Sequence, residues 1–191
     1  MERNQGRECI LRAAAKIFAD KSYEGARVDE IAKEAGVTKS LLYYHFKSKE
    51  EIFDVLVEQL FAEYQKLITE VRAQKVDYES DSLKERMQTK YFPFGTGNED
   101  LIRCAFIESL KRENGCRVFF QMVELQRDDA DQKMMEKLVL EYYFNLLPCV
   151  AFLCQKEAWS EHFHIDIEQL GTIFLEQYDQ VHGRYHRGGK K

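Results

Sequence analysis

The chain has 191 residues with a formal net charge of −5, and 45% of its residues are hydrophobic while 32% are charged. This balance is typical of a soluble folded protein of one or two small domains. The chain has no run of 18 apolar residues and its first nine residues are polar, so we expect neither a transmembrane helix nor a signal peptide. Five cysteines without a CxxC pair favour reduced thiols and a cytoplasmic location.

The charge is unevenly distributed along the chain. Residues 1–49 hold ten of the 28 basic residues and seven of the 33 acidic ones, a net charge of +3, which leaves −8 for the remainder. A basic segment followed by an acidic one predicts one part that faces DNA and another that does not.

The amino-terminal segment reads as three short helices. Apolar residues recur at helical spacing in residues 8–21 and again in residues 28–35. Gly36 is suited to end the second helix in a left-handed conformation, and Thr38 is a fair N-cap for a third helix ending near His45. Two helices joined by a short turn that contains glycine are the helix-turn-helix motif, whose second helix enters the major groove.

The stretch from Gly36 to Lys49, GVTKSLLYYHFKSK, contains three lysines, one histidine, two tyrosines and no carboxylate. With AAAKIF in the first helix, YEG at 23–25, IA at 31–32, AGV at 35–37, LYYHF at 42–46 and KSKEE at 47–51, the segment resembles the tetracycline-repressor (TetR) family of bacterial transcription regulators. Two residues depart from the family pattern. Ser22 replaces a usual Gly, a change expected to cost little. Arg27 replaces a usual Thr or Ser. The hydroxyl contact of that residue would be lost, and the arginine could contact a phosphate or a base edge instead.

The predicted DNA-binding residues have different roles. Side chains in the first turns of the third helix reach base edges, and Lys39 can pair with guanine O6 and N7. The resemblance implies a phosphate clamp of Tyr44, His45 and Lys49, and Leu42 and Phe46 are expected to be core. The full predicted set is Arg27, Thr38, Lys39, Ser40, Tyr43, Tyr44, His45, Lys47 and Lys49.

The rest of the chain also reads as helical. A capping box at Ser48–Glu51 opens a rod-like helix that reaches about Gln74, and a second capping box opens at Ser82. We expect a break at residues 93–98 (PFGTGN), then helices over 99–113, 116–127, 133–159 and 165–181, with a kink or break at Pro148. The predicted fold is all-α with about nine helices. It comprises a helix-turn-helix domain over residues 1–48 and a helical effector-binding and dimerisation domain over residues 49–191.

Aromatic residues at helical spacing in the second half form either plain core or the wall of a pocket for a mostly apolar small molecule. The resemblance favours an effector pocket. The predicted lining is Phe106, Phe119, Phe120, Tyr142, Tyr143, Phe152 and Trp159. His162 and His164 fit a loop better than a metal site, so we expect no metal and no cofactor.

These observations predict a ligand-responsive regulator, most simply a repressor, that binds a palindromic operator as a homodimer and is released by an effector. The last two long helices would form the dimer interface; the alternative is that the stripe of the final helix packs inside its own subunit. The stripe comprises Ile167, Leu170, Phe174 and Tyr178. An all-α enzyme or carrier would need a catalytic constellation, and none is recognisable in the sequence. An adaptor without DNA binding would not need the lysines and tyrosines of the third helix.

Overall fold

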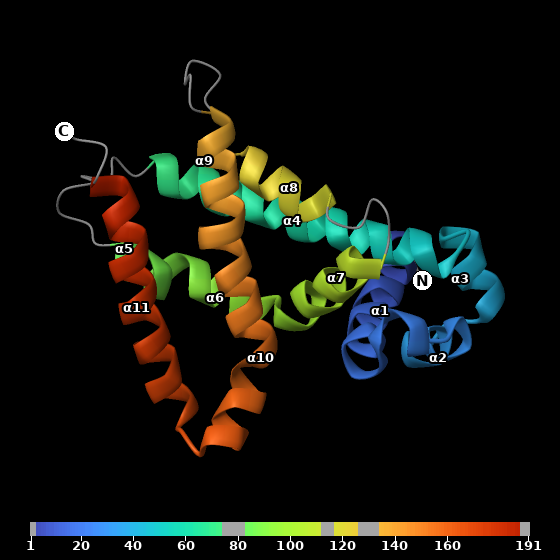
Figure 1. Cartoon of the computed structure of the whole chain (residues 1–191). Coiled ribbons are helices and arrows are strands. Elements are labelled where there is room, and N and C mark those ends of the chain that lie inside the picture. Colours follow the sequence, from blue (N-terminus) through green and yellow to red (C-terminus); the bar gives the residue numbers. More distant parts are fainter. Residues whose placement is uncertain (1–2, 74–82, 112–116, 126–133, 188–191) are drawn as a thin grey trace. The chain divides into compact units, whose positions relative to one another are not determined.

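The computed structural model describes residues 3–73, 83–111, 117–125 and 134–187, and within these ranges every element is helical (Figure 1). Counted as continuous runs, the described residues form nine helices, as predicted. Two of these runs contain a π-helical stretch. The elements are α1 (Arg3–Gly25), α2 (Val28–Glu34), α3 (Lys39–His45), α4 (Lys49–Ala73), α5 (Leu83–Arg86), η1 (Met87–Tyr91), α6 (Phe92–Gly97), α7 (Glu99–Lys111), α8 (Arg117–Glu124), α9 (Met134–Leu140), η2 (Glu141–Leu146), α10 (Leu147–Phe163) and α11 (Ile167–Arg187).

The chain divides into two compact units. Unit 1 comprises Met1–Glu63 and Asp100–Val118, and unit 2 comprises Tyr64–Glu99 and Phe119–Lys191. Helix α4 therefore contributes its first part to unit 1 and its last part to unit 2. The predicted domain boundary at residue 48 remains a prediction.

The core of unit 1 is built from one apolar stripe on each of its helices. The stripe of α1 is buried as its spacing predicted, and α2, α3 and α4 each contribute fully buried side chains. Burial of a large aliphatic or aromatic side chain contributes roughly 1.5–3 kcal/mol, so these side chains hold the short helices α2 and α3 in place. The large side chains of unit 1 with 2% exposure or less are Ile10, Phe18, Ile31, Leu42, Phe46, Ile52 and Leu60.

Helix α1 is kinked near its carboxyl end. Ser22 has φ 61° and ψ 169°, which is a conformation that glycine adopts readily and other residues do not. The chain then makes a further helical turn, where the sequence had suggested a loop. The serine therefore carries backbone strain, and the expectation that it costs little in place of glycine is wrong.

The predicted break at Pro93 does not occur. Pro93 is the second residue of α6, and the π-helical turn η1 leads directly into it, so the helix is irregular before the proline and continues past it. The helix ends only at Asn98, whose side-chain amide donates to the carbonyl of Phe94 at 3.1 Å. Gly95 allows a close approach of α10, because a Cβ there would lie 2.7 Å from Cδ1 of Leu153.

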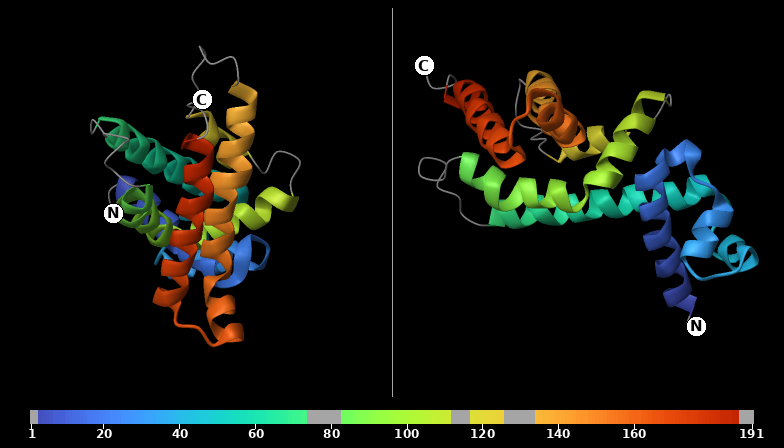
Figure 2. Two further views of the ribbon diagram at one scale, coloured as in Figure 1. Left: turned by 60° about the vertical axis from the view of Figure 1, so that its left-hand side comes forward. Right: turned by 90° about the horizontal axis from the view of Figure 1, so that it is seen from below.

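The chain also remains helical across Pro148. The π-helical stretch η2 immediately precedes the first turn of α10, in which the proline lies. A π-helical turn is a common site of helix irregularity, so the predicted interruption appears as a local widening and not as a break. Asp166 then caps α11 through the amides of Glu168 and Gln169, at 2.9 and 3.1 Å. Helices α10 and α11 pack as neighbours joined at His164, which has φ 53° (Figure 2).

One helical stretch, Met134–Phe163, is long and apolar enough to cross a membrane by length and composition, with a mean hydropathy of 1.4. Length and composition alone do not test the expectation that the chain has no transmembrane helix, which remains a prediction. Only 11% of the apolar window is buried inside the chain. A core helix of a monomeric protein would be covered, so this stretch has surface available to a partner.

Replacing Ser22 by Gly should relieve the strain at the kink. Strain of this kind costs on the order of 1–3 kcal/mol, and Gly loses roughly 0.5–1 kcal/mol of unfolded-state entropy in return. We expect Ser22→Gly to raise the free energy of unfolding by about 1 kcal/mol in urea denaturation. Ser22→Ala, which keeps the Cβ atom, serves as the control and should give no gain. A destabilised Ser22→Gly would show that the hydroxyl group, and not the backbone, determines this position.

Candidate nucleic-acid interface

The turn before helix α3 determines where this helix begins. Gly36 has φ 65° and ends α2 in the left-handed conformation that its type predicted. The hydroxyl oxygen of Thr38 accepts from the amide of Leu41 at 3.2 Å and caps α3. Leu42 and Phe46 are 0% and 1% exposed and anchor the helix, as predicted. The turn and the two anchors therefore fix which face of α3 is presented to solvent.

Most of the predicted DNA-binding side chains lie on that exposed face. Tyr43 and Tyr44 are 46% and 65% exposed, which is unusual for large aromatic residues unless they meet a partner. His45 is half-buried and Lys49 is half-buried. The remaining predicted residues are all exposed, and they are Arg27, Thr38, Lys39, Ser40 and Lys47.

The beginning of α1 lies beside the end of α3. A Cβ atom at Gly6 would lie 3.2 Å from Nε2 of His45, so a larger residue would displace the imidazole. The guanidinium of Arg7 lies over the ring of Phe46 at 5.1 Å from its centroid. Both contacts orient residues at the carboxyl end of α3, where the phosphate clamp was predicted.

Lys39, the first residue of α3, is paired with Asp29 in the first turn of α2. Its ammonium lies 2.7 Å from Oδ1 of Asp29, and both side chains are exposed. The hydrogen bond and the charge of Asp29 raise the pKa of Lys39 above its ordinary value. Sequence reasoning missed Asp29 because the two residues lie ten positions apart in different helices, and nothing in the sequence pairs them.

Lys49 is placed differently from its predicted role. Its ammonium donates to the carbonyls of Tyr23 and Ala26 at 2.6 and 3.0 Å and lies 4.3 Å from the centroid of the Tyr23 ring. Three donors directed at the carboxyl end of α1 satisfy carbonyls that a helix leaves unpaired. In this structure Lys49 therefore fastens α4 to α1, and its contact with phosphate remains a prediction.

Arg27 precedes α2 at the N-cap position without a side-chain cap. Its backbone is extended, and its carbonyl accepts from the amides of Glu30 and Ile31 at 3.0 and 3.1 Å. A Thr or Ser here would accept from an amide of the first turn; Arg offers no acceptor. The exposed guanidinium is consequently available for the phosphate or base contact expected of it.

The predicted effector-pocket residues fall into separate groups. Phe106 belongs to unit 1 and the other six to unit 2. Phe120, Tyr143 and Trp159 are 50%, 57% and 50% exposed, whereas Phe119 is buried. Phe152 stacks on Phe174 with a centroid distance of 4.2 Å, and Tyr142 contacts both Phe120 and Tyr143. An aromatic cluster between α6, α10 and α11 is thus present, although its members are only partly those predicted.

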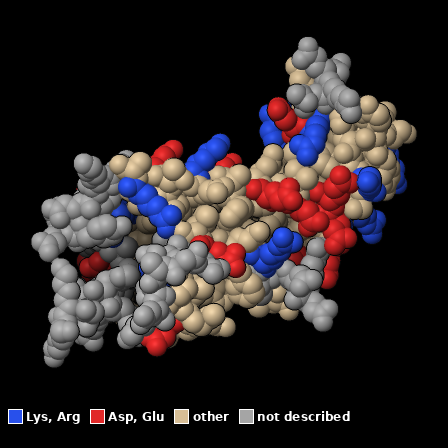
Figure 3. All heavy atoms as spheres, turned by 90° about the horizontal axis from the view of Figure 1, so that it is seen from above, with Lys and Arg blue, Asp and Glu red and all other residues tan. Residues whose placement is uncertain are grey.

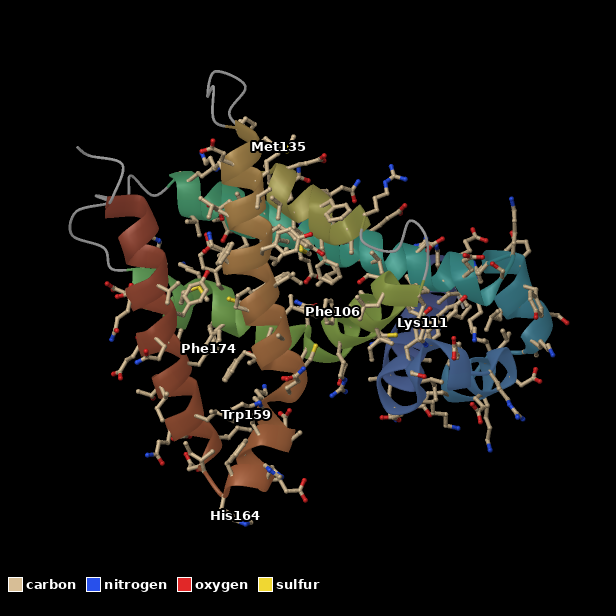
Figure 4. All side chains as sticks on the ribbon, viewed as in Figure 1. Phe106, Lys111, Met135, Trp159, His164 and Phe174 are labelled. Atoms are coloured by element: carbon tan, nitrogen blue, oxygen red, sulfur yellow. The ribbon has the colours of Figure 1, made fainter. Side chains whose placement is uncertain are left out.

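The predicted dimer stripe of α11 faces its own chain at two of its four positions. Phe174 lies against Phe152 and Phe92, and the Tyr178 hydroxyl donates to the carbonyl of Asn145 at 3.4 Å (Figure 4). Leu170 is half-buried, and Ile167 is 38% exposed. The inward direction of Phe174 and Tyr178 matches the alternative weighed for this stripe. The reason is that α10 and α11 are neighbours, so each covers the other's apolar face first.

Two cysteines, the buried Cys104 and the half-buried Cys149, are not suited to a reactive site. Burial raises the pKa of the Cys104 thiol to about 11 and that of Cys149 to about 12. Both thiols are therefore protonated at neutral pH, and the thiolate needed for oxidation chemistry is scarce. Among the residues that the structure describes, no group of three or more His, Cys, Asp or Glu side chains is arranged to hold a metal ion.

Residues 10–56 match the family model for the bacterial regulatory proteins of the TetR family. The match covers α1 to the first turns of α4, which includes the turn at Gly36 and the whole of α3. The amino-terminal segment of the chain is therefore similar to that of TetR-family regulators. This confirms the resemblance drawn from the helix-turn-helix residues.

The curated relatives that match this chain are transcription regulators. It is 41% identical over 59 residues to the transcriptional activator FasR of Mycolicibacterium smegmatis, covering 31% of this chain and 27% of FasR. It is 24% identical over 200 residues to the regulator YerO of Bacillus subtilis, covering 93% and 65%. It is 36% identical over 74 residues to IcaR of Staphylococcus aureus, a negative regulator, covering 39% of each chain. The matches thus span less than two thirds of these relatives' own lengths.

Solved structures share the fold over most of this chain. A TetR-family regulator from Mesorhizobium loti aligns with a TM-score of 0.59 at 16% identity, covering 95% of this chain and 98% of that one. FadR from Bacillus subtilis, in complex with stearoyl-CoA, aligns with a TM-score of 0.58 at 19% identity, covering 90% and 96%. The helix-turn-helix unit followed by a helical carboxy-terminal part is therefore the fold of the whole described chain.

The contacts of Lys49 predict a stability effect that an exposed DNA-binding lysine would not have. Hydrogen bonds that involve a charged group contribute roughly 1.5–3 kcal/mol when partly buried. We expect Lys49→Ala to lower the free energy of unfolding by about 2 kcal/mol in urea denaturation. Lys47→Ala, at an exposed position two residues earlier, is the matched control and should change the free energy of unfolding by less than about 0.5 kcal/mol.

DNA titrations at several salt concentrations would separate the two roles of Lys49. A phosphate contact would lower the slope of log affinity against log salt by about 0.9 when the lysine is removed. If Lys49→Ala is as stable as the parent and loses that slope, the lysine acts on DNA and the contact with α1 is incidental.

Proposed function

We propose that this protein is a transcription regulator that binds a palindromic operator as a homodimer and responds to a small, largely apolar effector. The observation that carries the proposal is the exposed, carboxylate-free face of α3, held rigidly by the buried anchors Leu42 and Phe46. A helix presented in this way fits a major groove, and Lys39 supplies the donor that reads guanine. A single helix-turn-helix makes few base contacts, so two copies are needed for specificity.

Dimerisation is supported by the apolar surface of unit 2. Along α10 and α11 the exposed apolar side chains include Trp159 and Phe163, whose rings lie 4.5 Å apart, together with Ile173 at 42% exposure. The face of the molecule in Figure 3 has areas without Lys, Arg, Asp or Glu side chains between its charged residues. We infer that a second copy covers the α10–α11 pair, which makes a self-complementary four-helix arrangement with two-fold symmetry. The outward side chains, and not the inward Phe174 and Tyr178, would form that interface.

The effector is proposed to bind among the aromatic side chains of unit 2. The cluster of Phe92, Phe152 and Phe174 is only partly buried, and helix η2 beside it is irregular. Apolar walls of this kind favour a ligand with an apolar body. The stearoyl-CoA complex of the similarly folded FadR supports a search that includes acyl compounds.

We propose repression as the direction of control. Repression requires only that the dimer occupy its operator, and the effector would release it by favouring a spacing of the two α3 helices that does not match the DNA. The named relatives include both a negative regulator and an activator. Expression of a reporter gene behind the operator, measured with and without the protein, shows whether the protein represses or activates. The same reasoning supports a cytoplasmic location, where the DNA is.

Lys39→Ala should relax the sequence preference of the protein. Loss of a lysine contact to a guanine edge costs on the order of 1–3 kcal/mol for the preferred operator and much less for other DNA. Binding-site selection from random DNA, repeated with the variant, measures the change. Lys33→Ala, which removes an exposed lysine outside the predicted DNA-binding set, is the control. An unaltered base preference in Lys39→Ala at matched salt would assign the reading of bases to other residues.

Trp159→Glu combined with Ile173→Glu should convert the dimer into a folded monomer. Carboxylates at two exposed apolar positions are harmless in a monomer and costly in a buried interface. Sedimentation should show the monomer, and operator affinity should fall steeply, because two half-sites roughly 34–36 Å apart are no longer engaged together.

Phe174→Ala provides the contrasting control for that dimer experiment. Its ring stacks inside the chain, so truncation should cost about 3–5 kcal/mol of stability without a specific effect on association. A double Glu variant that remains dimeric would locate the interface elsewhere. A parent protein that is monomeric and floats with lipid vesicles would overturn the dimer proposal and assign the apolar stretch Met134–Phe163 to a membrane.

A thermal-shift screen should find stabilising ligands among apolar and amphipathic compounds, including acyl thioesters. Occupancy at 100 times the dissociation constant raises stability by about 2.7 kcal/mol, which such a screen detects easily. Phe152→Ala should weaken the response, and the hit should release operator DNA. Stabilisation by highly charged metabolites alone, without release of DNA, would contradict an apolar effector.

A further inference from the structure

The ion pair between Asp29 and Lys39 joins the starts of α2 and α3. Both residues lie in the first turn of their helix, both side chains are exposed, and the ammonium lies 2.7 Å from the carboxylate oxygen. Two other exposed pairs, Lys16–Glu34 and Lys21–Glu30, tie α1 to α2 instead. Of these three pairs, only Asp29–Lys39 includes a residue of α3.

Stability does not explain the Asp29–Lys39 pair. Exposed ion pairs contribute roughly 0–1 kcal/mol, so the chain gains little by holding the recognition lysine in place. A carboxylate at the front of a DNA-binding surface also repels phosphate and lowers affinity for DNA in general. A negative group in this position is useful only if it contributes to discrimination between sequences.

The pair presents one donor and one acceptor at hydrogen-bond spacing. A G·C pair offers the matching pattern in the major groove, where the O6 acceptor of guanine lies next to the N4 amine of cytosine. These two atoms are themselves hydrogen-bonded in the base pair, so their separation is also about 3 Å. The geometry of the ion pair therefore corresponds to the edge of one base pair.

We propose that Asp29 is a specificity-determining residue that reads one G·C pair per half-site together with Lys39. Lys39 donates to guanine O6 and N7, while Asp29 accepts from cytosine N4. The inverted C·G pair brings an amine against the ammonium and a carbonyl against the carboxylate. The pair thus reads the polarity of the base pair, which a lone lysine reads less well. This inference rests on the proposed operator binding.

The test compares operators in which each base pair of the half-site is inverted in turn. At one position, inversion should weaken binding of the parent protein strongly. In Asp29→Ala the penalty for inversion at that same position should fall roughly 5- to 10-fold, because the clash of carboxylate with carbonyl is gone. Lys39→Ala should reduce the penalty at the same position, and the double variant should add little to either change.

Glu34→Gln is the matched control, because it removes one carboxylate of an exposed α1–α2 ion pair in the same unit. It should leave the inversion penalties unchanged at every position while showing how much the loss of one negative charge raises affinity for all DNA. Urea denaturation of each variant checks that the fold persists.

The possible outcomes separate the pair from the function on which it rests. If Asp29→Ala changes affinity for all sequences equally, as the control does, or changes preference at a position that Lys39→Ala leaves alone, the pair does not read a base pair. If the parent protein itself selects no sequence from random DNA, the proposed operator binding fails instead.

Discussion

Unit 1 depends on the contacts that hold the carboxyl end of α1. The ammonium of Lys49 donates to the carbonyls of Tyr23 and Ala26, just after the strained residue Ser22. Lys111 of α7 adds an ion pair to Glu24 at 3.2 Å, and the ring of Tyr23 packs against Phe53 at 5.0 Å. Cations suit a helix carboxyl end because its carbonyls carry partial negative charge. Helices α4 and α7 are thus both fastened to the same turn of α1.

This arrangement has a functional consequence, since α1 also supports α3. The beginning of α1 fixes His45 through Gly6 and Phe46 through Arg7. In the proposed regulator, a change in α4 or α7 would reach α3 through α1. Strain at Ser22 marks the joint at which such a change would be absorbed.

Unit 2 divides its apolar surface between two uses. Inward side chains such as Phe152 and Phe174 stack on each other, whereas Trp159 and Ile173 remain exposed on the same helix pair. The stretch Met134–Phe163 is consequently too apolar for a solvated surface and too exposed for a core. The exposed face of this helix pair is the surface on which the proposed dimer rests.

The sequence by itself determined the recognition unit, because its signals are local. Gly36 and Thr38 act within a few residues of chain and adopt the predicted geometry. Ser48 accepts from the amide of Glu51 as a capping box predicts, whereas the Glu51 carboxylate accepts from the amide of Lys47. The apolar stripes of α1 and α3 are likewise local patterns, and they are buried where expected. Residue types at short spacing are therefore enough to indicate the TetR family.

Tertiary structure alone decided what the longer-range pairs do. Lys49 has the residue type of a phosphate contact, yet carbonyls 23 and 26 positions away in sequence take its donors. Phe174 has the spacing of an interface residue, yet its ring stacks on Phe152 of α10 in the same chain. Pro93 and Pro148 look like helix breaks in the sequence. In the structure a π-helical stretch precedes each proline, and the helix continues past it. In each case the role of the residue depends on which elements pack against it in the folded chain. The spacing of residues along the sequence does not specify that packing.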